Sequence, residues 1–283
     1  MASNQRVAVV TGSSSGIGHE TSLTLARNSF LTYATMRSLD KGENIKSLAE
    51  KEKLPLKTVQ LDVTDDIAVK NAIQSITAEA NRIDVLVNNA GYAVVGAFED
   101  CSMEEIKAQY ETNLFGVIRV TQAVLPVMRK QKSGIIVNIS SGAGKIAIPV
   151  QSAYVSTKFA IEGLSESMAY ELEPFGIKVV LVEPGFIKTN IGNNIVTAKK
   201  SQDANSPYSQ LTENMVSFIE HGLETGSPPD VVAKVVLKAV TSENPNLRYL
   251  AGKDVEKWME AKRGMSDEEF HDLMKQNMMK YSL

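Results

Sequence analysis

The sequence predicts an α/β fold in which a doubly wound, mostly parallel sheet carries helices on both faces. Short, continuously apolar runs such as 7–10 and 178–182 alternate along the chain with stretches patterned as helices. Strands buried on both faces have this composition. A glycine-rich turn follows the first run and precedes a helix, and right-handed crossovers then favour an open sheet over other arrangements. The 283 residues suffice for one large domain that needs no metal or disulfide to hold it together.

The β-rich runs and the helical stretches follow one another in a regular order. Strands are expected at 7–12, 31–37, 57–63, 84–91, 135–141, 178–185 and 247–252. Helices are expected at about 17–28, 103–130, 154–173 and 229–241, with further helix-like sequence before 57 and before 84. The whole chain, 1–283, is therefore predicted to be a single domain of the Rossmann type.

Two regions fall outside this alternation. Residues 190–228 are too long for a simple connection, and their polar middle, 199–210, is expected to be mobile. The end of this region places Leu211, Met215, Phe218 and Leu223 on one side of a helix. We expect a substrate lid at about 188–228, although an apolar helix face of this kind is more often ordinary packing than a pocket wall.

The second region is a C-terminal extension at about 253–283, with charged helical sequence and many methionines. These include Met265, Met274, Met278 and Met279. The extension is compatible with packing on the body, covering a neighbour's site or binding a partner.

Composition excludes several classes of function. The net charge of −3 gives no sign of nucleic-acid binding. The single cysteine, Cys101, excludes an intrachain disulfide and favours a reducing, cytoplasmic setting. The N-terminal segment lacks the apolar stretch of a signal peptide, and no apolar run approaches the ~18 residues of a membrane span. The three histidines lie far apart and show no metal-ligand spacing, so no metal is expected.

The glycine-rich turn, TGSSSGIG at 11–18, predicts an anion site. Backbone N–H groups at a helix start point outward, and the helix dipole favours negative charge. Gly12 permits a tight turn, Gly16 lets the backbone approach a pyrophosphate, and Gly18 permits close helix–strand packing. The predicted phosphate-binding residues are Gly12, Ser14, Ser15, Gly16, Ile17 and Gly18. The alternative is a plain turn rich in glycine and serine.

The end of the second strand distinguishes the two nicotinamide dinucleotides. An acidic residue there would bind the ribose hydroxyls of NAD, but this chain has Arg37 after Met36. The forked guanidinium of Arg37 suits the 2′-phosphate of NADP(H), which is the predicted cofactor. In the alternative, Arg37 is a solvated charge and Asp40 serves the ribose.

Tyr154, Lys158 and Ser141 form the predicted catalytic set. Residues four apart on a helix share a face, so Tyr154 and Lys158 can act together. A tyrosine pKa near 10 must fall by about 3 units for work as a base at neutral pH. A nearby ammonium, in a partly dry site beside a cationic oxidised nicotinamide, is a reasonable source of that fall. Tyr154 would then exchange a proton with an alcohol or carbonyl, and Ser141 would hydrogen-bond the substrate oxygen. Taken singly, each residue has a structural alternative, such as a surface tyrosine, a solvated lysine or a capping serine.

With these motifs placed, the chain closely resembles the short-chain dehydrogenase/reductase family over about 5–252. The resemblance is carried, in order, by TGSSSGIG, Asp62-Val63, NNAG at 88–91, Asn113, Ser141, Tyr154, Lys158 and Pro184-Gly185. The glycine spacing favours the carbonyl-reductase-like branch. Segments such as ETNLFG and YVSTKFAIEGLSESMAYEL are similar to the retinol and 17β-hydroxysteroid dehydrogenase-like group.

The resemblance implies further roles for single residues. Asn113 would hold a water beside Lys158 in a proton relay, and Lys158 would also bind the nicotinamide ribose. The other implied cofactor contacts are Asp62 and Val63 at the adenine, Asn89, Ala90 and Gly91 along the cofactor, and Pro184, Ile187 and Thr189 at the carboxamide. Asn113 could instead pair within its helix, and Asp62 could simply end a strand. The family also commonly forms dimers or tetramers through helices that match 103–130 and 154–173.

The expected activity is an NADP(H)-dependent interconversion of a secondary alcohol with a ketone or aldehyde of mainly apolar character. Steroids and retinoids enter only through the resemblance, because one scaffold serves many chemistries. The alternative is a non-catalytic NADP(H)-binding sensor. An intact set of Asn113, Ser141, Tyr154 and Lys158 argues against the sensor, since binding alone does not require all four.

Overall fold

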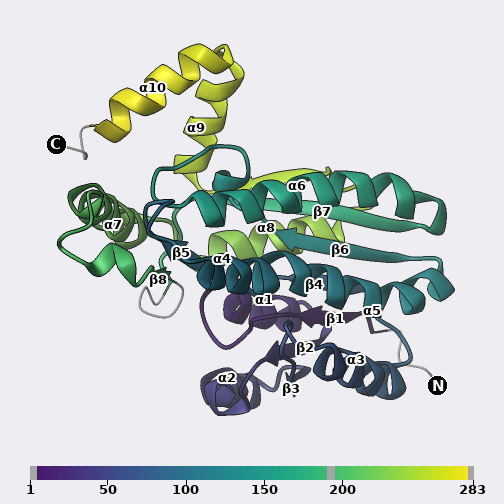
Figure 1. The fold of residues 1–283 in the computed structure, drawn as a ribbon. Helices are drawn as coiled ribbons and strands as arrows, with labels where there is room; N and C mark the ends of the chain where they lie inside the picture. The colour runs from purple at the N-terminus through teal and green to yellow at the C-terminus, as the bar shows by residue number, and fades with distance from the viewer. Residues whose placement is uncertain (1–4, 190–194, 280–283) are drawn as a thin grey trace.

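The central element is a seven-stranded parallel sheet in the part of the chain that the computed structural model describes, residues 5–189 and 195–279 (Figure 1). The strand order is β3-β2-β1-β4-β6-β7-β9. All strands are parallel, and the order in which they are added to the sheet reverses between β1 and β4, which marks a doubly wound fold. The strands are β1 (Val7–Val10), β2 (Leu31–Met36), β3 (Leu56–Gln60), β4 (Val85–Asn88), β6 (Gly134–Ile139), β7 (Ile177–Pro184) and β9 (Arg248–Ala251). The predicted fold class is confirmed.

Helices cover both faces of the sheet. They are α1 (Gly16–Arg27), α2 (Glu43–Glu52), α3 (Asp66–Ala80), α4 (Met103–Tyr110), α5 (Gly116–Gln131), α6 (Ser152–Leu172), α7 (Ser209–Thr225), α8 (Pro229–Thr241), α9 (Lys253–Arg263) and α10 (Asp267–Met279). Alternate residues of β1 explain the two layers: Val7 and Val9 pack with α3 and α5, whereas Ala8 and Val10 pack with α1 and α8. Every residue of β1 is therefore buried, as the apolar run predicts.

Local side chains fix where several helices begin. Asp65 caps α3 by accepting hydrogen bonds from the N–H groups of Ile67 and Ala68. Ser102 and Glu105 form a reciprocal capping box at the start of α4. These ends position the loops that follow β3 and β5 (Ala93–Val95) beside the carboxyl edge of the sheet.

Three boundaries differ from the sequence prediction. The third strand ends at Gln60 instead of continuing to 63, because Asp62 folds back onto Thr64 in a turn. The helix expected at 103–130 is divided by a π-helical turn, η2 (Glu111–Phe115), which the continuous periodicity conceals. The helix expected from 154 begins at Ser152.

The lid region contains more structure than its polar composition predicted. β5 pairs in parallel with β8 (Ile195–Thr197), and a short 3₁₀ turn, η6, spans Lys200–Gln202. Ser206 is buried and donates a 2.6 Å hydrogen bond to Asp100. The polar segment 199–210, expected to be mobile, is therefore anchored to the body at Asp100. The part of the predicted lid at 190–194 lies outside the described residues.

The C-terminal extension packs on the body of the molecule. Val255 and Met259 of α9 are buried with Ile146, and Phe270 of α10 joins the same cluster. Met274 of α10 packs, partly buried, on the apolar cluster that includes Met215 and Ile219 of α7. Residues 280–283 of the predicted extension lie outside the described residues, as do the side chains of the methionines at 278 and 279.

Candidate active site

The glycine turn between β1 and α1 is shaped by positions that have no room for a side chain. Gly12 and Gly16 have φ values of +68° and +58°, a region that glycine enters without strain. A Cβ added at Gly18 would lie 2.4 Å from the carbonyl oxygen of Gly12 and 2.4 Å from Nδ2 of Asn89. α1 thus starts directly against the turn, with its first N–H groups at the carboxyl edge of the sheet.

Hydrogen bonds between Thr11, at the start of the turn, and Asn89, which follows the neighbouring strand β4, hold the turn in place. Nδ2 of Asn89 donates to the carbonyl oxygens of Thr11 at 2.9 Å and Gly12 at 3.1 Å. The N–H groups of Asn89 and Ala90 both donate to the hydroxyl of Thr11, at 2.9 and 3.1 Å. The side chain of Asn89 therefore positions the glycine turn. Thr11 was not assigned a role from sequence; its position immediately before Gly12 was the available signal.

Gly91 lies beside the π-helical turn. A Cβ at Gly91 would be 3.1 Å from Oδ1 of Asn113, so this end of β4 closes against η2. The three residues Asn89, Ala90 and Gly91 thus form a short bridge between the glycine turn and the catalytic region.

Arg37 follows β2 and its side chain is exposed at the same edge. Gln60 donates to the Arg37 carbonyl oxygen at 3.2 Å, which fixes the backbone and leaves the guanidinium to solvent. Asp40, the alternative ribose ligand, sits in the turn η1 (Leu39–Gly42) and accepts a 3.4 Å hydrogen bond from Ser38. The structure therefore offers a cation at the end of β2 and a carboxylate in the following turn.

Asp62 and Val63 lie just after β3, and their groups make different contacts. Oδ1 of Asp62 accepts from the N–H and the hydroxyl of Thr64, at 2.9 and 2.7 Å. The Val63 side chain is buried against Gly116, and its carbonyl oxygen accepts from Arg119 at 2.6 Å. Any contact of Val63 with a ligand would therefore use its backbone.

Ser141, Tyr154 and Lys158 come together beyond the end of β6. Ser141 caps the 3₁₀ turn η3 (Gly142–Gly144), accepts from the Ala143 N–H at 3.1 Å, and is hydrogen-bonded to Tyr154. Lys158 Nζ donates to the Ile139 carbonyl oxygen at 2.8 Å and lies 5.7 Å from the centroid of the Tyr154 ring. Because Tyr154 and Lys158 occupy successive turns of α6, the helix presents both on one face.

Burial dominates the protonation of this pair. It raises the pKa of Tyr154, and the hydrogen bond from Ser141 opposes that rise only in part. It also lowers the pKa of Lys158 to about 8, against the opposing charge of Glu162. In the cofactor-free protein the shift at Tyr154 therefore runs opposite to the lowering expected beside Lys158 and an oxidised nicotinamide, because burial is its largest cause.

Asn113 is buried in η2, and its side-chain amide is hydrogen-bonded to neighbouring residues. Oδ1 accepts from the Tyr92 N–H at 3.1 Å, while Nδ2 donates to the Tyr92 carbonyl oxygen at 2.9 Å and to Thr157 at 3.3 Å. Thr157 in turn donates to the Tyr154 carbonyl oxygen at 2.8 Å. Asn113 is thus linked to the helix that carries Tyr154, and both donors of its amide are in use.

The loop after β7 is held by the C-terminal extension. The Phe186 N–H donates to Oδ2 of Asp254 at 2.7 Å, and a Cβ at Gly185 would lie 2.2 Å from that carboxylate. Ile187 is buried in the core beside α8, so only its backbone faces outward, whereas Thr189 is half-buried. Asp254 was not predicted, because nothing in its local sequence indicates a contact 68 residues away.

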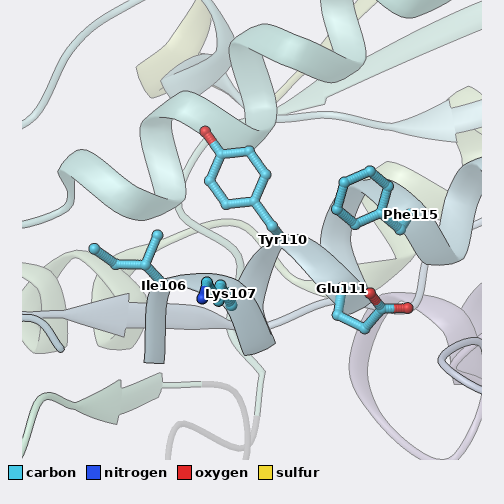
Figure 2. A pocket seen from close by; sticks show the side chains of 5 residues that line it. All are labelled: Ile106, Lys107, Tyr110, Glu111 and Phe115. Carbon is cyan, nitrogen blue, oxygen red and sulfur yellow. The ribbon is translucent and has the colours of Figure 1, made fainter. Parts of the chain in front are cut away.

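The predicted residues therefore collect at one place in the fold. The glycine turn follows β1, Asn89 follows β4, Ser141 follows β6 and Pro184 ends β7. The carboxyl ends of these adjacent parallel strands form the edge where ligands bind in open α/β sheets. A separate surface groove is lined by Ile106, Lys107, Tyr110, Glu111 and Phe115 of α4 and η2, and includes none of these residues (Figure 2).

Two negative observations apply to the described residues. No cluster of three or more His, Cys, Asp or Glu residues in this part of the chain is placed to hold a metal ion. No helix within 5–189 or 195–279 is both long and apolar enough to cross a bilayer.

A dinucleotide-type turn joined to a Ser-Tyr-Lys site at one sheet edge defines a nicotinamide-dependent oxidoreductase. Residues 6–200 match the family model described as short chain dehydrogenase. The chain belongs to the short-chain dehydrogenase/reductase family, in the retinol dehydrogenase-like group.

Three curated relatives illustrate this placement. The uncharacterized oxidoreductase YusZ of Bacillus subtilis is 41% identical, with 89% of this chain and 91% of the relative covered. A 3-ketodihydrosphingosine reductase of Bacteroides thetaiotaomicron is 36% identical, over 98% of this chain and 96% of the relative. Retinol dehydrogenase 8 of Bos taurus is 36% identical, over 88% and 82%.

Solved structures agree with the fold. A short-chain dehydrogenase from Streptomyces avermitilis superposes with a TM-score of 0.83 at 31% identity, covering 98% of this chain and 99% of that one. A Thermococcus sibiricus alcohol dehydrogenase complexed with 5-hydroxy-NADP has a TM-score of 0.72 at 25% identity, over 88% and 97%. A Burkholderia phymatum family member in complex with NAD has a TM-score of 0.77 at 20% identity, over 88% and 90%. The family thus binds nicotinamide cofactors of both kinds.

Proposed function

We propose that this protein is an NADP(H)-dependent oxidoreductase that interconverts a secondary alcohol with a ketone or aldehyde of mainly apolar character. The observation that carries the proposal is the meeting of Ser141, Tyr154 and Lys158 at the sheet edge that also holds the glycine turn. In this proposal the whole chain is one domain with a lid at about 188–228 and an extension at about 253–283, and it works in the cytoplasm.

The residues present fit a dinucleotide. Gly12 and Gly18 leave a cradle that a single Cβ would fill, and the first N–H groups of α1 lie beside it. The exposed Arg37 guanidinium, at the end of β2, suits a 2′-phosphate through charge-assisted hydrogen bonds. Ser14, Ser15, Gly16 and Ile17 would hold the pyrophosphate, and Asp62 and Val63 the adenine. Asn89, Ala90, Gly91, Lys158, Pro184, Ile187 and Thr189 would hold the nicotinamide half.

When bound, the nicotinamide ring donates or accepts the hydride. The chain supplies the proton: Tyr154 gives it to the carbonyl oxygen in reduction and takes it from the alcohol in oxidation. The raised pKa of Tyr154 keeps its hydroxyl protonated at neutral pH, which suits the reductive direction. Ser141, already hydrogen-bonded to Tyr154, holds the substrate oxygen as charge develops on it.

Asn113 completes the proposed proton path. Because both donors of its amide are used, a relay water beside Lys158 would bind through an oxygen of Asn113. A π-helical turn disrupts the usual pattern of backbone hydrogen bonds and is frequent at functional sites, which supports this role for η2.

The substrate side is apolar. Val95, Val150, Phe186 and Phe218 from four segments join one cluster beneath the lid helix α7, and the Phe186 and Phe218 rings meet edge to face at 5.7 Å. Met215 and Ile219 of α7 are fully packed there, so part of the lid face is core. The relatives named for 3-ketodihydrosphingosine and for retinol act on apolar compounds by those names, which supports a lipid-like substrate here.

A homodimer or homotetramer is also proposed. Exposed apolar side chains lie on the segments expected to form the interface: Met103, Phe115, Phe159 and Tyr170. The groove of Figure 2 lies on the same α4–η2 surface. Light scattering of the eluting protein, compared with a Phe115→Glu variant, tests this: a smaller particle for the variant supports the interface, and a monomeric wild type contradicts it.

NADPH oxidation in the presence of a panel of apolar ketones and aldehydes tests the activity. Tyr154→Phe should lose about 10²–10⁴-fold in kcat while keeping NADPH affinity, because only the proton donor is removed. Tyr110→Phe removes a tyrosine hydroxyl outside the site and should behave as wild type. If wild type binds NADPH but turns over no carbonyl or alcohol, the proposed activity is contradicted and the alternative, a non-catalytic sensor, is supported.

A further inference from the structure

A cluster of buried charges continues the catalytic face of α6. Tyr154, Lys158, Glu162 and Glu166 follow one another at four-residue spacing, so they form a single stripe along the helix. Beyond Lys158 this stripe meets Lys145 from the segment after η3, Glu183 of β7 and Arg248 of β9. The Glu162 and Glu183 side chains are only 5% and 2% exposed, which is rare for carboxylates.

Contacts within the cluster favour a negative charge on Glu162. Its Oε2 lies 3.0 Å from Arg248 Nε and 3.4 Å from Lys145 Nζ, so one carboxylate oxygen forms ion pairs with two cations. Glu183 Oε1 has Arg248 Nε at 3.1 Å and no comparable lysine contact among the described pairs. Two carboxylates that share one arginine in a buried site cannot both ionise cheaply, so the first proton belongs to Glu183.

Unsatisfied oxygens support this assignment. Oε1 of Glu162 and Oε1 of Glu183 are both buried and make no hydrogen bond within the described part of the chain, because the nearby Nε–H of Arg248 donates to Oε2 of Glu162. Burial and the neighbouring Glu162 raise the pKa of Glu183 to about 7.

We propose that Glu162 is a positioning residue for Lys158: its buried carboxylate, held by Lys145 and Arg248, keeps the Lys158 ammonium charged and directed at the Ile139 carbonyl oxygen and Tyr154. Glu162 stands one helical turn from Lys158, on the same face and away from solvent, where a charge acts strongly. The titratable and charged groups that face this pair are Tyr154, Lys145, Glu166, Glu183 and Arg248.

Lys158 needs such a partner because it is partly buried. Burial lowers its pKa to about 8, and Glu162 is the charge that opposes the fall. A neutral residue at 162 would let the pKa of Lys158 drop further towards neutrality. Lys158 would then lose its positive charge in the pH range in which the proposed reaction uses it.

The test measures the titration of Lys158 in the cofactor-free protein. Acetylation by dilute acetic anhydride, quantified at Lys158 by mass spectrometry across pH, reports the unprotonated fraction of the amine. Glu162→Gln should lower the midpoint by about one unit or more. Glu166→Gln, on the same stripe but half exposed and two turns from Lys158, is the matched control and should leave the midpoint unchanged.

Two further variants separate charge from disruption of packing. Glu162→Asp keeps the carboxylate and should restore most of the wild-type midpoint. Lys145→Gln deletes a cation from the same cluster and should move the midpoint upward, opposite to Glu162→Gln. Midpoints that do not move, or that move in the same direction in Glu162→Gln and Lys145→Gln, overturn the proposal. If Glu162→Gln does not fold, as judged by circular dichroism, the sign of the Lys145→Gln shift decides.

An activity measurement links this inference to the proposed function, on which that measurement alone rests. The alkaline limb of kcat/KM for carbonyl reduction should shift to lower pH in Glu162→Gln and stay in place in Glu166→Gln. A protein without any turnover would contradict the proposed function and leave the acetylation result standing. A shifted acetylation midpoint with an unshifted alkaline limb would contradict the role of the Lys158 charge in the reaction.

Discussion

The glycine turn and the catalytic helix α6 lie at the same edge of the sheet, yet they are built by opposite means. At the turn, Gly12 and Gly18 exclude side chains, and backbone groups tied to Asn89 do the positioning. At α6, buried charged side chains from several elements surround Lys158 and Glu162. The structure of the glycine turn therefore depends on the absence of side-chain atoms, and the structure of the α6 region depends on the balance of buried charges.

This difference determines what each region tolerates. A turn that fits against backbone atoms fails when any atom is added, whatever its polarity. A buried charge cluster accepts an isostere of the same shape but responds to the loss of one charge, because its partner is left unpaired. Substitutions that change only volume or only charge therefore distinguish the two regions.

The largest effect is expected from Gly18→Ala. The added methyl would lie 2.4 Å from the Gly12 carbonyl oxygen, a backbone atom that cannot rotate away. The start of α1 must shift, which should weaken NADPH binding by about 100-fold and cost about 1–3 kcal/mol of stability. Fluorescence titration with NADPH and urea unfolding measure the two effects.

Gly163→Ala is the matched control for this variant. Gly163 lies within α6, and a Cβ there meets no atom within 4 Å. Since alanine is the better helix former, this substitution should be neutral or stabilising by about 0.5–1 kcal/mol. Wild-type NADPH affinity in Gly18→Ala would show that the turn is not limited by space.

A smaller effect is expected from Arg37→Ala. The exposed guanidinium contributes to cofactor choice and little to stability, so loss of a charge-assisted contact to a 2′-phosphate should raise KM for NADPH by about tenfold or more. KM for NADH should hardly change. The ratio of kcat/KM values for the two cofactors is the measurement.

Lys41→Ala removes a cation from the adjacent turn η1 and controls for a general loss of positive charge. Its cofactor ratio should stay at the wild-type value. A wild-type enzyme that prefers NADH would contradict the assignment of Arg37 and favour Asp40 as the ribose ligand.

The two regions also differ in how far the sequence predicts them. The glycine turn is local: its residues lie within TGSSSGIG, and the structure places them between β1 and α1 as expected. The Tyr154–Lys158 pair is local for the same reason. The pKa of Tyr154 in the cofactor-free protein is not a local property, because burial, which depends on the whole fold, raises it.

The unpredicted features join segments far apart in the chain. Asp254 holds the Phe186 N–H across 68 residues, and Arg248 reaches Glu162 across 86. The turn η2 keeps a helical periodicity, so a pattern of apolar residues cannot reveal its altered hydrogen bonds. The strand pair β5–β8 depends on three-residue segments that carry too little signal.

A dependence of stability on pH tests whether the α6 region is limited by charge. The pKa of Glu183 is raised from an ordinary 4.5 to about 7 by burial and by Glu162. The unfolded chain therefore releases this proton at lower pH than the folded one, and the group's contribution to stability is lost as pH rises from about 4.5 to about 7. Glu183→Gln stays neutral, so its free energy of unfolding relative to wild type should rise across this interval and level off above it. Glu173→Gln, an exposed change at the end of α6, should show no such trend in urea unfolding. A flat difference for Glu183→Gln would mean that the two buried carboxyls do not share a proton.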